Sequence, residues 1–268
     1  MFDDDKKTIR QMAPLLQRVL ICDPQPASGR LLGELMRNIA RSQVWMASST
    51  ERGLKVAETC EPDIVFVELN EGQVDGVAFT KRLRRSQLSC RQAPVITVTG
   101  QATACDILAA RDAGVHEFLR KPFTTRDLLR RLEAVTLRQR DWVEAVGYIG
   151  PDRRRFNSGD YKGSLKRRSD TRETPDAARI AQALKILRSA VIAYDSDPEQ
   201  AMRAMRAQAT DIQKAATAVA DLRLVTTATD FQRYLGQAQT LTRAGLETAT
   251  AALLAYMPKD YELRDAAA

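Results

Sequence analysis

The chain has 268 residues, of which 44% are hydrophobic and 28% charged, and its formal net charge is +7. This balance is typical of a folded soluble protein and excludes a disordered chain, and no run approaches the roughly 18 apolar residues of a membrane helix. The acidic start MFDDDKK lacks the apolar stretch of a secretory signal, so we expect a cytoplasmic protein.

Cysteine and histidine usage limits the chemistry further. The four cysteines lie in the first half without CxxC spacing, which indicates reduced thiols rather than a disulfide framework or a zinc site. His116 is the only histidine, which argues against a multi-histidine metal centre and gives no basis for a catalytic triad.

In the first half, short apolar runs alternate with longer amphipathic segments. The runs predicted to be strands are RVLIC, QVWMA, IVFVEL, PVITVT and EFLR. Helical patterns begin near Ala27, Thr50, Gly76, Thr103 and Thr125. Thr50 and Thr125 stand at expected N-cap positions. Five such units predict a doubly wound α/β domain with a five-stranded parallel sheet and a site at the carboxyl ends of the strands.

Four ordered segments of this half, VLICDPQP, VELNEGQVDG, PVITVTG and FLRKPF, resemble the landmarks of bacterial response-regulator receiver domains. The resemblance covers residues 17–140 and implies a flavodoxin-like receiver fold. It also implies a phosphorylation site at the carboxyl edge of the sheet. The residues that match positions of this site are Asp23, Pro24, Glu68, Thr99, Phe118 and Lys121.

Two of these positions depart from the family pattern. Receivers carry an acidic pair after the first strand, but here Pro24 follows Asp23 and offers no side-chain ligand to Mg²⁺. Glu68 stands where the phospho-accepting aspartate is expected. By the same resemblance, Thr99 matches the switch hydroxyl, Lys121 the lysine that pairs with the phosphoryl group, and Phe118 the switch aromatic residue.

These departures have chemical consequences. Glutamate is one methylene longer than aspartate, and phosphoryl transfer depends on in-line positioning and on charge neutralisation by a metal with near-octahedral oxygen ligands. We therefore expect no acyl phosphate, no Mg²⁺ and no enzymatic activity. The domain is interpreted as a pseudo-receiver in which Glu68 reaches toward Lys121 and holds the activated-like arrangement. Two alternatives stay open: Glu68 as a tolerated replacement without effect on the switch, and phosphorylation of an unusual acceptor.

Most of the excess charge lies after this domain. The stretch 148–172 holds eight Lys/Arg and three Asp, so the other 243 residues carry only +2. Within it, YIGPDRRR (148–155) and YKGSLKRR (161–168) repeat Tyr-x-Gly before a basic triplet. A plain linker gives no reason for such a repeat, and the pattern favours a binding element.

The residue types of the repeat suit a ligand with two guanines and two phosphates. Arginine binds phosphate oxygens bidentately and matches the O6/N7 edge of guanine, tyrosine stacks on a purine, and glycine allows close backbone approach. Aspartate can accept hydrogen bonds from guanine N1 and N2. We therefore expect the chain to bind cyclic di-GMP. The predicted ligand-binding residues are Tyr148, Gly150, Asp152, Arg153, Arg154, Arg155, Tyr161, Gly163, Lys166, Arg167, Arg168 and Asp170.

Residues 17–172 as a whole resemble the CheY-like cyclic di-GMP effectors of alphaproteobacteria, which are receivers with an arginine-rich tail. The resemblance implies an adaptor that acts on a protein partner such as the flagellar motor or the attachment machinery. The second copy departs from the pattern at Ser164 and Leu165. The same arginines could contact nucleic acid or an anionic membrane, which would not explain the repeat. The main alternative is a ligand-independent receiver-fold scaffold whose basic tail is a linker.

The last third has helical periodicity. One helix is expected around residues 180–194, and DPEQ (197–200) supplies an N-cap, an N1 proline and an N3 glutamine for a second. A third helix is expected to start after Asp230 and to end before Pro258. These helices predict a compact antiparallel bundle, or a coiled-coil-like contact that forms a homodimer.

The predicted organisation has four parts. Residues 1–16 are an N-terminal extension and residues 17–142 the degenerate receiver domain. Residues 143–175 are the arginine-rich ligand-binding tail, and residues 176–268 a helical interaction or dimerisation domain.

Overall fold

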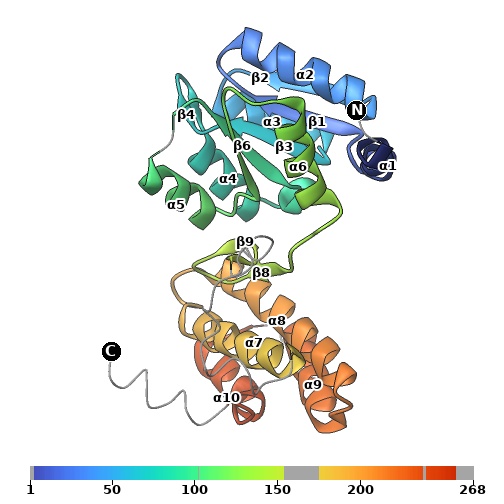
Figure 1. Cartoon of the computed structure of the whole chain (residues 1–268). Coiled ribbons are helices and arrows are strands. Elements are labelled where there is room, and N and C mark those ends of the chain that lie inside the picture. Colours follow the sequence, from blue (N-terminus) through green and yellow to red (C-terminus); the bar gives the residue numbers. More distant parts are fainter. Residues whose placement is uncertain (1–2, 102, 154–174, 238–239, 258–268) are drawn as a thin grey trace. The chain divides into compact units, whose positions relative to one another are not determined.

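The computed structural model describes residues 3–101, 103–153, 175–237 and 240–257. They fall into two compact units, each described here by itself (Figure 1). The α/β unit contains residues 3–143 and 148–153, and the helical unit contains residues 144–147 together with the described residues from 175 onward.

The predicted parallel sheet is confirmed. Its strands are β1 (Arg18–Cys22), β2 (Gln43–Ala47), β3 (Ile64–Glu68), β6 (Val95–Thr99) and β7 (Glu117–Arg120), in the order β2-β1-β3-β6-β7. Every residue of β3 and β6 is buried, because helices cover both faces of a doubly wound sheet. The strand order reverses between β1 and β3, and the carboxyl ends of strands at such a reversal form a crevice for ligands.

Two helical layers enclose the sheet in the α/β unit (Figure 1). The helices are α2 (Pro26–Ala40), α3 (Thr50–Cys60), α4 (Gly76–Arg85), α5 (Ala104–Asp112) and α6 (Thr125–Thr136). Residues of α2 and α6 share one core cluster with β1, β3 and β6, and residues of α3, α4 and α5 share the other. Short connections complete the unit: the hairpin of β4 (Asn70–Glu71) and β5 (Val74–Asp75), and the 3₁₀ turn η2 (Ser89–Gln92).

The predicted N-caps of two helices are wrong by one residue. The side chains of Ser49 and Thr124 accept the capping hydrogen bonds of α3 and α6, and Thr50 and Thr125 are already helical. Each cap is part of a pair of adjacent hydroxyl residues, and only the first of each pair has the extended backbone that an N-cap requires.

The N-terminal extension belongs to the α/β unit. It forms α1 (Asp3–Met12) and the 3₁₀ turn η1 (Ala13–Leu15). Met12 and Leu16 are fully buried in the core cluster of α2 and α6. The segment before β1 therefore closes one edge of the core.

The helical unit contains four helices within its described residues, where three were expected. They are α7 (Pro175–Ile192), α8 (Pro198–Ala218), α9 (Leu222–Gln237) and α10 (Arg243–Leu254), which share one apolar core. Asp197 caps α8 as predicted. The single third helix is wrong, because α9 begins eight residues before Asp230 and α10 begins anew where Thr242 accepts a hydrogen bond from Gly245 N.

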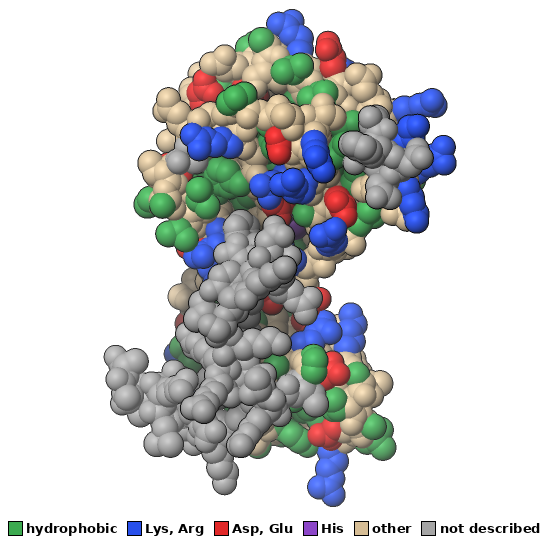
Figure 2. Space-filling view, viewed as in Figure 1, with side chains coloured by type: hydrophobic (Ala, Val, Ile, Leu, Met, Phe, Trp, Pro, Cys, Tyr) green, Lys and Arg blue, Asp and Glu red, His purple; other side chains and the backbone are tan. Residues whose placement is uncertain are grey.

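None of the helices in the described parts of the chain is long and apolar enough to cross a membrane. Figure 2 shows basic and acidic side chains interspersed over the face in view, with small hydrophobic groups between them. The sequence itself places +5 of the net charge of +7 in the stretch 148–172.

Candidate functional site

The carboxyl edge of the sheet brings three of the residues predicted from the sequence into contact. Asp23 follows β1, Glu68 is the last residue of β3, and Lys121 follows β7. Asp23 is 8% exposed and Glu68 is 2% exposed. The site is thus built on two buried carboxylates that enter from neighbouring strands, and it lies at the reversal of strand order.

Lys121 joins these carboxylates. Its Nζ lies 2.7 Å from Glu68 Oε2 and 2.9 Å from Asp23 Oδ2. Burial by itself lowers the pKa of Lys121, but the hydrogen bonds to Glu68 and Asp23 outweigh it and raise the pKa above its ordinary value. The other oxygen of Glu68 accepts a hydrogen bond from Leu69 N at 2.9 Å. The edge therefore holds an ammonium ion bridging two carboxylates.

The surroundings of Asp23 decide what else could bind there. Its oxygens also accept hydrogen bonds from Gln25 N at 2.8 Å and from Ser28 Oγ at 2.7 Å. The ligand atoms of Asp23, Glu68 and Glu71 lie within 4.8 Å of one another, a set that suits a hard divalent cation. Such an ion would compete with the ammonium of Lys121 for two of the three carboxylates. That the site binds no Mg²⁺ stays a prediction.

Pro24 and the two switch positions lie around this centre. Pro24 directly follows Asp23 and faces Gly72, where an added Cβ would lie 3.2 Å from the proline Cβ. The Thr99 hydroxyl donates to Gln101 O at 2.9 Å and accepts from Gln101 N at 3.3 Å. Phe118 is half-buried and packs against the core cluster of α3, α4 and α5. Thr99 is therefore bonded within its own loop.

The first copy of the basic repeat is partly built into the α/β unit. Two short strands, β8 (Trp142–Glu144) and β9 (Ile149–Pro151), form a separate two-stranded sheet. Gly150 on β9 packs against Gly114, because a Cβ added at Gly150 would lie 2.7 Å from Gly114 Cα. Of the predicted ligand-binding residues, eight lie outside the described residues: Arg154, Arg155, Tyr161, Gly163, Lys166, Arg167, Arg168 and Asp170.

Tyr148, which we expected to stack on a purine, is 8% exposed. Its hydroxyl donates to Pro151 O at 2.6 Å, and burial raises its pKa to about 12. The guanidinium of Arg153 lies over the tyrosine ring, 4.1 Å from its centroid, and pairs with Asp112 at 2.6 Å. Asp152 precedes it and is half-buried. In this conformation Arg153 occupies a face of the ring.

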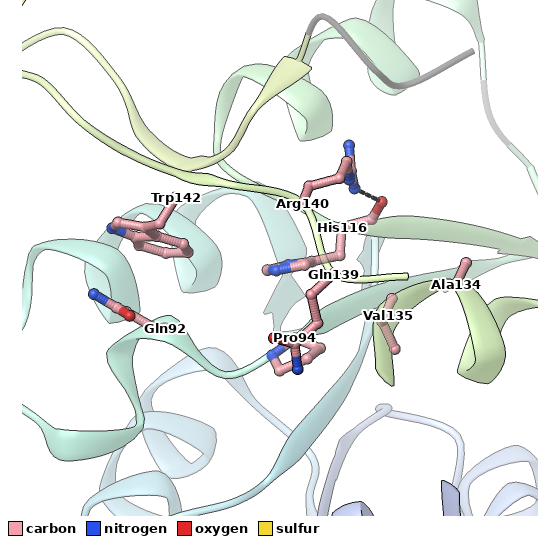
Figure 3. Close-up of a pocket in the computed structure, with 8 residues that line it drawn as sticks. All are labelled: Gln92, Pro94, His116, Ala134, Val135, Gln139, Arg140 and Trp142. Atoms are coloured by element: carbon pink, nitrogen blue, oxygen red, sulfur yellow. Dashed lines mark hydrogen bonds between the residues drawn. The ribbon is translucent and has the colours of Figure 1, made fainter. Parts of the chain in front are cut away.

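Sequence reasoning missed a pocket near the amino ends of β6 and β7. It has a volume of about 310 Å³, and its lining residues are Gln92, Pro94, His116, Ala134, Val135, Gln139, Arg140 and Trp142 (Figure 3). These residues come from η2, α6, β8 and the segments before β6, β7 and β8, so no local pattern marks the pocket. The one visible signal was Trp142, an aromatic residue just after the last α/β helix.

His116 in this pocket is held neutral. Its Nδ1 lies 3.3 Å from both Val95 N and Arg84 Nη2, and since both partners are donors, Nδ1 accepts and Nε2 carries the proton. Burial lowers the pKa of His116 well below its ordinary value, and the charges of Arg84 and Arg140 add to this. Arg84 is itself buried and lies 5.2 Å from the centroid of the Trp142 ring.

Comparison with known proteins identifies the α/β unit. The family model described as "Response regulator receiver domain" matches residues 19–133. The chain is 30% identical over 128 residues to the DNA-binding dual master transcriptional regulator RpaA of Synechocystis, which covers 48% of this chain and 52% of that protein. It is 28% identical over 118 residues to the probable chemotaxis protein CheY of Rhizobium etli, covering 44% of this chain and 91% of that protein.

The chain spans about half the length of the first curated relatives it matches. Among solved structures, a putative response regulator from Chloroflexus aurantiacus is matched with a TM-score of 0.42 at 24% identity, over 46% of this chain and 98% of that one. The sheet order, the carboxylates and lysine at its carboxyl edge and the matched family model lead to one assignment. Residues 19–133 are a receiver domain of the response-regulator (CheY-like) family.

Proposed function

We propose that this chain is a non-enzymatic signalling adaptor whose receiver domain works without phosphorylation. The observation that carries the proposal is the contact of Lys121 Nζ with Glu68 Oε2 at 2.7 Å. In the family, this lysine pairs with the phosphoryl group. Here a carboxylate of the chain itself supplies the partner, so the ion pair exists without any phosphate. The partner surface is then permanently in one state.

Phosphorylation chemistry tests this proposal directly. The protein is incubated with a small phosphodonor and Mg²⁺, and its intact mass is measured. We expect no gain of a phosphoryl group in the wild type. The double variant Pro24→Asp, Glu68→Asp restores the acidic pair and an acceptor of family length, and we expect it to gain one group. A wild-type protein that becomes phosphorylated would contradict the proposal.

The second part of the proposal concerns the ligand. The repeat of Tyr-x-Gly before each basic triplet supports binding of cyclic di-GMP through the arginine-rich tail. The described part of the first copy lends support, since Arg153 already pairs with the carboxylate of Asp112, a contact that a phosphate would take over. Ligand binding at the tail would then change the surface that a protein partner contacts.

Isothermal titration tests this part. We expect cyclic di-GMP to bind selectively over GTP and over a cyclic dinucleotide without guanine, and the double variant Arg154→Ala, Arg167→Ala to lose binding. A variant with the tail scrambled at constant composition separates a site from bulk charge. If neither the wild type nor the scrambled variant binds cyclic di-GMP selectively, the alternative holds, in which the receiver is a ligand-independent scaffold and the tail is a linker. Binding that does not distinguish the three nucleotides and weakens steeply as the salt concentration rises would indicate a nonspecific polyanion contact.

A further inference from the structure

The structure changes which aromatic residue could stack on a ligand base. A purine needs one accessible ring face, but the ring of Tyr148 is 8% exposed and has Arg153 over it. Its hydroxyl is bonded to Pro151 O. Stacking on Tyr148 would require β9 to leave its position against Gly114. A neighbouring aromatic residue is better placed.

Trp142 is that residue. It is half-buried, lies six residues before Tyr148 and forms a wall of the pocket of about 310 Å³ (Figure 3). This volume is at the lower end of the range for small-molecule sites, roughly 300–1,000 Å³, and suits one heteroaromatic base with part of its sugar. Tryptophan offers a large ring for base stacking. Arg84 fixes the indole through its cation–π contact.

The polar groups of the pocket suit the edge of a purine. Gln92 of η2 and Gln139 of the segment between α6 and β8 are exposed carboxamides, and each offers both donors and an acceptor. Arg140 is the one charged residue among the eight lining residues, and its guanidinium is oriented by a hydrogen bond to His116 O. None of these eight is a carboxylate. The lining therefore favours a neutral base attached to an anionic group over a cationic ligand.

The pocket also lies beside the start of the arginine-rich tail. Asp152 N donates to Asp141 O at 2.7 Å, which joins the residue before Arg153 to the residue between Arg140 and Trp142. The first basic triplet therefore starts from the same short sheet that carries the pocket wall. Arg153 is the described residue of this triplet, and it follows β9, the strand that pairs with β8 and its pocket wall.

We infer that the pocket formed by Trp142, Gln92 and Gln139 holds a purine base. Resting on the proposed function, this base is one guanine of cyclic di-GMP. Trp142 supplies the stacking face, and the two carboxamides bond to the base edge.

Tryptophan fluorescence tests the inference in the full chain, which contains two tryptophans. In a Trp45→Phe background, Trp142 is the only tryptophan. Cyclic di-GMP and, separately, GMP are titrated with fluorescence and heat recorded together. We expect cyclic di-GMP to quench Trp142 in step with the binding heat. The double variant Gln92→Ala, Gln139→Ala should bind cyclic di-GMP roughly tenfold or more weakly than the wild type. The control Gln43→Ala changes an exposed residue of the edge strand β2 and should bind cyclic di-GMP as the wild type does.

The outcomes separate the inference from the proposed function. Cyclic di-GMP could give binding heat without quenching Trp142, and with the same affinity for the glutamine double variant. This result would overturn the assignment of the base to the pocket and leave the tail as the proposed site. Quenching of Trp142 by GMP in a protein that gives no heat with cyclic di-GMP would support the purine pocket and overturn the proposed ligand. Absence of quenching by both nucleotides would overturn the pocket.

Discussion

Lys121 determines the energetics of the receiver site at the scale of single residues. It compensates two carboxylates that are 8% and 2% exposed, and it is the ammonium that contacts both. A buried charge that loses its partner is strongly destabilising, whereas a pair removed together is often tolerated. The ion pair of Lys121 with Glu68, which we propose replaces phosphorylation, is therefore also needed for the stability of the fold.

Replacing Lys121 by methionine should lower the free energy of unfolding by about 3 kcal/mol, because Asp23 and Glu68 are left facing each other without a cation. The triple change that adds Asp23→Asn and Glu68→Gln should recover most of this loss. Urea unfolding measures both. The control Lys81→Met removes an exposed lysine and should cost little. A Lys121 variant as stable as the control would contradict the importance of the ion pair.

His116 predicts a dependence of stability on pH. In the unfolded chain its pKa is about 6.5, and in the fold burial and the charges of Arg84 and Arg140 hold the pKa well below that. Below about pH 6.5 the unfolded state therefore binds a proton that the folded state does not. Stability should fall with falling pH, by up to about 1.4 kcal/mol per pH unit.

The variant His116→Asn keeps an acceptor near Val95 N but has no group that titrates in this range. We expect its free energy of unfolding to change less between about pH 6.5 and 5, where ordinary carboxyl groups are still mostly ionised. Urea unfolding at several pH values compares the two proteins. Equal slopes would show that His116 is protonated in the fold or that another group is responsible.

At the scale of elements, the central strands β1, β3 and β6 could be predicted because they are apolar runs that are almost entirely buried, a pattern that depends on local sequence alone. The resemblance to receiver domains identified Asp23, Glu68 and Lys121 as site residues, and the correctly predicted strands place them at the carboxyl edge of the sheet. The helix caps at Ser49 and Thr124 could not be fixed, because two adjacent hydroxyl residues compete for each.

Features that depend on contacts distant in sequence were missed. The burial of Tyr148 requires Gly114, which lies 34 residues earlier and allows β9 to approach closely. The pocket combines Gln92 with Trp142 from separate elements. The start of α10 depends on the side-chain cap of Thr242, which interrupts an apolar stripe that otherwise reads as one long helix.

The position of β9 gives a prediction for this element. A Cβ at Gly150 would lie 2.7 Å from Gly114 Cα and from the Tyr148 hydroxyl, so Gly150→Ala should displace β9 and cost about 1–3 kcal/mol. Hydrogen exchange should show faster exchange at Asp152 N, whose bond to Asp141 O joins the strands. Gly147→Ala is the matched control, since nothing lies within 4 Å of its Cβ. Equal exchange in both variants would disprove the close contact.

At the scale of the whole molecule, the chain does not pass from one unit to the other at a single point. Residues 144–147 belong to the helical unit, while residues 148–153 return to the α/β unit. Glu144 accepts from Gln200 Nε2 at 2.9 Å, and its carbonyl accepts from Gln208 Nε2 at 2.9 Å. Val146 packs against the core of the helical unit. A cut anywhere between residues 142 and 175 therefore leaves one unit incomplete.

Thiols supply a reporter for one unit alone. Cys22, Cys60 and Cys90 are buried in the α/β unit, and the remaining cysteine, Cys105, is exposed in it. Burial raises the pKa of Cys22, and it raises that of Cys60 to about 11, so these thiols react slowly while the unit is folded. Their labelling therefore measures opening of the α/β unit, whereas circular dichroism reports on the helices of both units.

The variant Gln200→Leu tests whether the two units unfold independently. Leucine has a similar volume, but the buried carboxylate of Glu144 loses a donor, so the helical unit should lose about 2 kcal/mol of stability. We expect part of the helical signal, that of α7 to α10, to be lost at lower urea concentration, with unchanged labelling of the three buried thiols. Lys214→Leu places the same side chain at an exposed position of α8 and should leave both measurements near wild type. If labelling instead accelerates together with the loss of helix, the two units form one cooperative structure. A ligand acting on the tail between them would then change the stability of both units, whereas independent units would confine its effect to the one it contacts.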